Sequence, residues 1–111
     1  QCMMPIRANM ALYIGGMGAR DKNFYNNYAK ALGFADAAVE IQDLFLAGRK
    51  DEAAAAVPAE LIDACHLVGP AERIKERLQR WKTAGNNGQV ASMLLGCQQP
   101  EALELIASEV L

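Results

Sequence analysis

The sequence predicts a mainly α-helical fold with one short buried strand, at about residues 90–95. Apolar residues recur at helical spacing through most of the 111-residue chain, and glycine or proline separates these stretches. Residues 90–95 differ because they are almost continuously apolar, as in a strand that is covered on both faces. A helical pattern precedes this run and another follows it, which is the order of the last unit of an α/β protein.

Helices are predicted at about residues 6–17, 22–32, 34–47, 51–56, 58–65, 70–84 and 99–110, all within a single helical domain or barrel fragment. The glycines at residues 15–18 end the first of them. Asp21 is expected to cap the N-terminus of the second helix, and Gly33 is expected to follow it as the C′ residue. Gly48 ends the third helix in the same way, and Gly85 is expected to close the helix at 70–84.

The short helices in the middle of the chain are predicted from charge and from proline. Asp51 and Glu52 stand in a first turn, where the helix dipole favours acidic side chains. Pro58 ends that helix and serves as the first residue of the next. The expected inward residues of the last two helices are Ile74, Leu78, Trp81, Leu103, Ile106 and Val110.

A single strand at 90–95 cannot satisfy its own backbone groups. Each buried N–H or C=O group without a partner costs about 1–3 kcal/mol. The strand is therefore expected to pair with a second copy, with another chain, or with the missing part of a larger fold. The helices also carry wide apolar faces, so a homodimer, or another homo-oligomer, is the expected assembly.

Composition excludes several classes of partner and site. The net charge of −2 provides no basic field for phosphate backbones, so nucleic acid is not an expected partner. No apolar run approaches the roughly 18–20 residues of a membrane helix. The cysteines Cys2, Cys65 and Cys97 have no metal-ligand spacing, and His66 is the one histidine, so no metal site is expected. Reduced thiols are typical of a cytoplasmic protein.

Three features could be binding or catalytic sites, but each also has a plainer structural role. Glycines at 15–18 could cradle a phosphate, but a break that lets neighbouring backbone pack closely is favoured. Arg20 and Lys22 could hold an anion, but solvated charges at a helix start are favoured. His66 could act as a base, but a packing or capping role is favoured, and no catalytic residue is predicted.

Several sequence words, in order, resemble the luciferase-like monooxygenase superfamily, and most closely its flavin- or deazaflavin-dependent oxidoreductases. They are LYIGGMGARDKNFYN at 12–26, IQDLFLAGRK at 41–50, EAAAAVP at 52–58, LVGP at 67–70 and QQPEAL at 98–103. The resemblance implies part of a TIM barrel, a fold that takes about 250 residues. These residues resemble its C-terminal third, and residues 85–89 depart from the family pattern before the strand.

The resemblance also implies a cofactor for the intact family member, either FMN or a deazaflavin. Gly96, Cys97, Gln98 and Gln99 follow the strand, where barrel active sites lie, and are the implied cofactor contacts. An ordinary strand–helix connection is the alternative for these four residues. The isolated chain is expected to bind no cofactor and to lack catalytic competence, because the strands that supply most of the pocket are missing. A non-enzymatic helical module for self-association is the alternative function.

Overall fold

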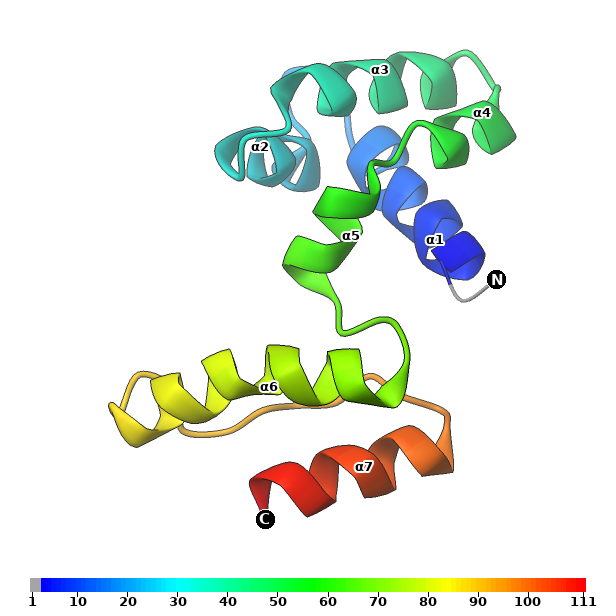
Figure 1. The fold of residues 1–111 in the computed structure, drawn as a ribbon. Coiled ribbons are helices and arrows are strands. Elements are labelled where there is room, and N and C mark those ends of the chain that lie inside the picture. The colour runs from blue at the N-terminus through cyan, green and yellow to red at the C-terminus, as the bar shows by residue number, and fades with distance from the viewer. Residues whose placement is uncertain (1–2) are drawn as a thin grey trace. The chain divides into compact units, whose positions relative to one another are not determined.

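The computed structural model describes residues 3–111, which form helices and no strand (Figure 1). The helices are α1 (Met3–Gly16), α2 (Phe24–Ala31), α3 (Ala35–Leu46), α4 (Lys50–Ala55), α5 (Ala59–Cys65), α6 (Ala71–Asn86) and α7 (Pro100–Val110). The sequence predicts one domain, whereas the described residues gather into two compact units, one ending at His66 and the other spanning Leu67–Leu111. The predicted helices are thus present, with ends that shift by a few residues.

The first unit is built around α1, which packs against α2, α3 and α4. Small side chains dominate its core and let these helices approach closely. The buried hydrophobic residues of this unit are Ala11, Ile14, Ala29, Ala38, Ile41, Ala53, Ala54, Val57, Leu61 and Ile62. Arg7 of α1 adds a long-range link, because its guanidinium donates to the backbone carbonyl of Val57, between α4 and α5. The core thus joins the beginning of the unit to its end.

Glycines end two helices of this unit as predicted. After α2, the Gly33 N–H donates to the Lys30 carbonyl and the Phe34 N–H to the Ala29 carbonyl, both at 3.0 Å. This pair of bonds is a Schellman motif, which requires the left-handed backbone that Gly33 adopts at φ 98°. Gly48 ends α3 in the same manner, with φ 81°.

The N-terminus of α2 differs from the prediction. Asp21 is exposed in the preceding turn, and Asn23 is the N-cap instead. The Asn23 Oδ1 accepts a hydrogen bond from the Asn26 backbone N–H at 2.9 Å. Asp and Asn are comparably good caps by residue type. Asn23 prevails because its amide group can also donate to the backbone of α1, which a carboxylate cannot do.

Two predicted boundaries beyond α3 are also corrected. Helix α6 continues through Gly85 to Asn86, and Gly88, with φ 70°, takes the predicted terminating role. Glycine is tolerated inside a helix, and only Gly88 supplies the left-handed conformation that ends one. Pro58, the predicted first residue of α5, is instead its N-cap, because its ψ of 145° is extended, and the helix begins one residue later, at Ala59.

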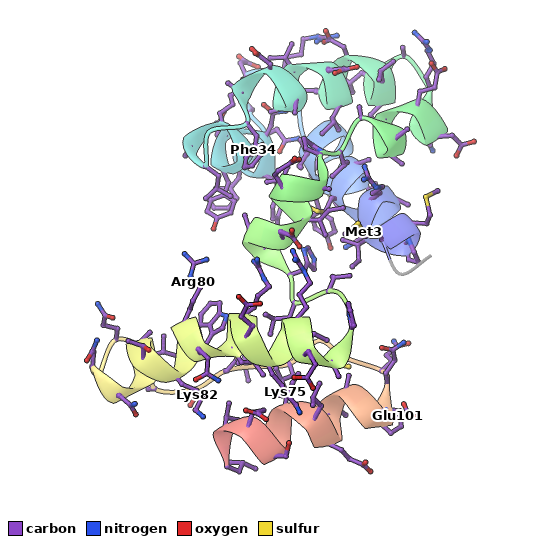
Figure 2. The ribbon with its side chains drawn as sticks, in the orientation of Figure 1. Met3, Phe34, Lys75, Arg80, Lys82 and Glu101 are labelled. Carbon is purple, nitrogen blue, oxygen red and sulfur yellow. The ribbon has the colours of Figure 1, made fainter. Side chains whose placement is uncertain are left out.

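In the second unit, α6 and α7 pack against each other, and Leu78 and Ile106 are buried. The prediction for Trp81 was wrong, since 47% of this residue is exposed; Leu103 and Val110 are exposed as well. Figure 2 shows Lys75 and Arg80 projecting from opposite sides of α6. Lys75 forms an ion pair with Glu72 at 3.3 Å. Two helices alone have too little surface to cover a broad apolar stripe.

The predicted strand at 90–95 is not formed in the described chain. These residues belong to an irregular stretch that connects the end of α6 to the start of α7 (Figure 1). Leu94 is 95% exposed and Leu95 is 40% exposed, so the run is not buried. A strand requires a neighbour for its ladder of hydrogen bonds, and the described residues provide none.

Candidate functional site

The four predicted cofactor contacts lie together at the junction between the irregular stretch and α7. Gln99 is the N-cap of α7, with extended backbone angles, and the Cys97 Sγ accepts from the Gln99 N–H at 3.4 Å. Gly96 and Gln98 are exposed. A Cβ added at Gly96 would meet nothing within 4 Å, so the backbone there is open to an approaching group.

The chemistry of this junction suits an anion better than a redox or acid–base group. The first N–H groups of a helix lack intrahelical partners and carry the positive end of the dipole. Glu101 adds a carboxylate to the same first turn, which weakens that attraction. Pro100 also removes one donor. Gly96–Gln99 themselves carry no charged side chain, so any attraction for an anion there comes from backbone N–H groups.

The glycines at 15–18 pack against the protein instead of forming an open cradle. A Cβ at Gly15 would lie 2.5 Å from the Phe45 Cβ, and a Cβ at Gly16 would lie 2.5 Å from the Phe45 ring. Gly18 has φ 150° and faces the Lys22 carbonyl. These contacts support the packing interpretation, because α1 and α3 can approach this closely only where α1 lacks side chains.

Arg20 and Lys22 are exposed in the loop after α1. Arg20 forms an ion pair with Asp43 of α3, and both side chains are at least half exposed. An exposed pair of this kind contributes about 0–1 kcal/mol. The geometry supports the interpretation that Arg20 and Lys22 are solvated surface charges. Their side chains do not form an anion site.

Two buried asparagines are the polar centre that the sequence analysis missed. The Asn23 Nδ2 donates to the Ile14 carbonyl at 3.0 Å, and the Asn26 Nδ2 donates to the carbonyls of Ile14, at 3.1 Å, and Ala38, at 2.8 Å. Both residues are 1% exposed. They therefore join the end of α1 to α2 and α3. The sequence signal that could have indicated this centre is the pair of asparagines, three residues apart, at the start of a helix.

His66 and Cys65 lie at the end of α5. His66 caps that helix, with its N–H donating to the Ile62 carbonyl at 2.8 Å, which supports the capping role. Burial raises the pKa of the Cys65 thiol. A raised pKa lowers the thiolate fraction at neutral pH, so Cys65 is not an activated nucleophile.

A surface hollow of about 380 Å³ lies between α3 and α4, lined by Glu40, Leu44, Arg49, Glu52, Ala55 and Ala56. The Arg49 Nε donates to the Glu52 Oε1 at 2.7 Å. This hydrogen bond lowers the pKa of Glu52 and raises that of Arg49. Glu52 is consequently ionised at neutral pH and unsuited to act as a general acid.

Metal and membrane sites are not supported within residues 3–111. No three His, Cys, Asp or Glu side chains in this range are grouped so as to hold a metal ion. Likewise, none of the helices described here combines the length and apolarity needed to cross a membrane.

Comparison with known proteins defines the class of this protein. The luciferase-like monooxygenase family matches residues 5–88, which is most of the chain, and the chain belongs to this family. A relative in Mycobacterium tuberculosis, named "Putative coenzyme F420-dependent oxidoreductase Rv3520c", is 39% identical over 80 residues. Those residues are 72% of this chain and 23% of the relative, so the chain matches less than a quarter of that protein's length. No solved structure matches significantly.

Proposed function

We propose that the chain acts as the C-terminal segment of a deazaflavin- or flavin-dependent oxidoreductase and is not catalytically competent alone. Its family membership and the printed name of its M. tuberculosis relative support this class of activity. The stretch at 90–95 carries the proposal. It is apolar and exposed at Leu94 and Leu95, and it lies between two helices, as a barrel strand does. A β-strand from the remainder of a barrel would cover it and complete its hydrogen bonds.

In that barrel, Gly96–Gln99 would hold the phosphate of the cofactor. The open backbone at Gly96 and the N-terminus of α7 fit an anionic group of this kind. When bound, the cofactor supplies hydride transfer, and this segment would contribute orientation. The free thiols of Cys65 and Cys97 support a cytoplasmic location for the protein.

A fluorescence titration of the purified 111-residue chain with FMN, and separately with F420, tests the proposal. We expect no saturation up to about 100 μM, because a ligand pocket must bury 70–90% of its ligand. The chain is then coexpressed with the M. tuberculosis relative from which the matched 80 residues are deleted. We expect the two to copurify and to bind F420. Micromolar affinity in the isolated chain, or no association with the deleted relative, would contradict the proposal.

Self-association is the second candidate function, and the exposure of Leu94 favours it for the isolated chain. An apolar strand-forming run without a partner is a template for pairing with a second copy. Two-fold pairing of residues 90–95 would give their backbone groups hydrogen-bond partners. It would also cover the leucine side chains. A homodimer is therefore the assembly that we propose in the absence of the rest of a barrel.

A further inference from the structure

The stretch between α6 and α7 has unpaired backbone groups along its length. In the described part of the chain, no backbone N–H or C=O group of residues 90–98 forms a hydrogen bond with another backbone group. The same stretch is apolar, and Leu94 is 95% exposed. An exposed apolar segment with a free row of donors and acceptors is a template for pairing with another strand.

The charged side chains of the second compact unit are divided between its two helices. Its five basic residues all lie on α6, whereas α7 carries only acidic ones, Glu101, Glu104 and Glu109. Two further glutamates on α6 make the unit neutral, so a second copy meets no net repulsion. Neither Arg80 nor Lys82 forms an ion pair with any described residue, and the same is true of the three glutamates of α7. These charges are therefore available to a partner.

The direction of the helices explains why α6 and α7 do not pair these charges with each other. The two helices pack together and run in the same direction, because the stretch between them returns to the end of the unit at which α6 begins (Figure 1). Figure 2 shows Glu101 at that end, whereas Arg80 and Lys82 lie toward the other end of α6. Within one copy, the basic end of α6 is thus separated from the acidic start of α7.

Two-fold pairing of the stretch removes this separation. A two-fold axis perpendicular to the paired strands makes them antiparallel, and each copy contributes the same surface. The second copy then begins its α7 at the end where the first copy carries Arg80 and Lys82. Glu101 and Glu104 of the second copy face those cations, and the axis repeats the arrangement at the opposite end. Parallel pairing would instead bring helix ends of like charge together.

We propose that a second copy docks with its 90–95 stretch antiparallel to that of the first, and that the basic end of α6 and the acidic start of the other copy's α7 select this direction. The inference rests on the self-association proposed above for the isolated chain. It adds the orientation of the two copies and the charges that determine it. Complementary charges across an interface fix orientation and exclude wrong pairings, because groups of like charge oppose association.

Sedimentation equilibrium of charge-reversed variants of the 111-residue chain tests the orientation. The variant Arg80→Glu/Lys82→Glu reverses the basic end of α6, and Glu101→Lys/Glu104→Lys reverses the acidic start of α7. We expect each alone to dimerise at least about tenfold more weakly than the wild type, because attraction becomes repulsion at both ends of the dimer. An equimolar mixture should dimerise about as tightly as the wild type, since every contact in the mixed dimer is again between opposite charges.

The matched control is Asp36→Lys/Glu40→Lys, which reverses two exposed acidic residues on α3, one of them in a first turn as Glu101 is. We expect this control to dimerise as the wild type does. Reversed variants that dimerise as tightly as the control, or a mixture as weak as its components, would overturn the orientation and leave self-association standing. A monomeric wild type would overturn both proposals.

Salt dependence of the wild type decides the matter if a reversed variant does not fold, which circular dichroism would show. Exposed ion pairs are screened when NaCl is raised from about 0.05 to 0.5 M, so the wild-type dimer should weaken at least about threefold. A dimer that is equally tight or tighter at the higher salt concentration would overturn the role assigned to these charges.

Discussion

Asn23 and Asn26 organise the first compact unit through their side-chain amides. The two residues donate to backbone carbonyls at the end of α1 and within α3, where water cannot replace them. Residue type predicts that an asparagine can cap a helix, and sequence reasoning placed the cap two residues too early, at Asp21. Burial distinguishes the two positions, and burial depends on α1 and α3, which are distant in sequence from the cap.

Asn26→Ala should lower the free energy of unfolding by about 2–3 kcal/mol, because it removes the buried side-chain hydrogen bonds to the carbonyls of Ile14 and Ala38. Asn27→Ala is the matched control, since Asn27 is the exposed neighbour on the same helix. It should change stability by no more than about 0.5 kcal/mol. Urea denaturation followed by far-ultraviolet circular dichroism measures both values. Equal midpoints for the two variants would refute the role assigned to Asn26.

Gly15→Ala should be destabilising although alanine is the better helix former. Its Cβ would lie 2.5 Å from the Cβ of Phe45, an atom fixed to the backbone of α3. We expect a loss of about 1–3 kcal/mol in the same denaturation experiment. Gly96→Ala meets open space and should be close to neutral. A Gly15→Ala protein as stable as the wild type would show that α1 and α3 are not in close contact at this point.

At the scale of elements, the helices were predictable and the strand was not. Gly33 and Gly48 end their helices by local hydrogen bonds, so the residues that decide these boundaries are adjacent in sequence. The run at 90–95 depends on a partner strand, and no local signal supplies one. The same distinction between local and long-range signals applies to the candidate sites. Gly96–Gln99 are consecutive and so lie together, whereas the polar centre of Asn23 and Asn26 required the folded arrangement of α1, α2 and α3.

Circular dichroism of the isolated chain should be dominated by helix. Strand content should be well below the 20–25% of an average domain, because residues 3–111 contain no strand in the structure. If residues 90–95 of two copies pair as strands, this short stretch would add a little to the strand content. A spectrum with more strand than helix would show that the chain folds differently in solution.

The molecule as a whole exposes more apolar surface in its second unit than two helices can cover. Trp81, Leu94 and Leu95 are each at least 40% exposed there, and Leu103 and Val110 are exposed as well. An isolated unit with so many exposed apolar side chains gains stability when another protein surface covers them. The remainder of the proposed barrel and a second copy of the chain are the two proposed sources of cover.

Sedimentation equilibrium of the isolated chain at micromolar concentration should therefore give a mass above the 12.0 kDa of one copy. Leu94→Pro should weaken this association, because proline removes one backbone donor from the pairing stretch. Leu94→Ala retains the N–H and is the control, with an expected loss that is smaller. A wild-type mass near 12.0 kDa would refute self-association. Equal dimerisation by the proline variant would refute pairing through 90–95.

The link between Arg7 and the Val57 carbonyl has a consequence for the order of events during synthesis. Its two ends are separated by 50 residues, and α1 also packs against α4. A ribosome adds about 5–20 residues per second, so α1 waits roughly 3–10 s for these partners to be made. During that interval the face of α1 that packs against α4 has no partner, although α2 and α3 have already been made. We therefore expect α1 to pack against α2 and α3 before it packs against α4.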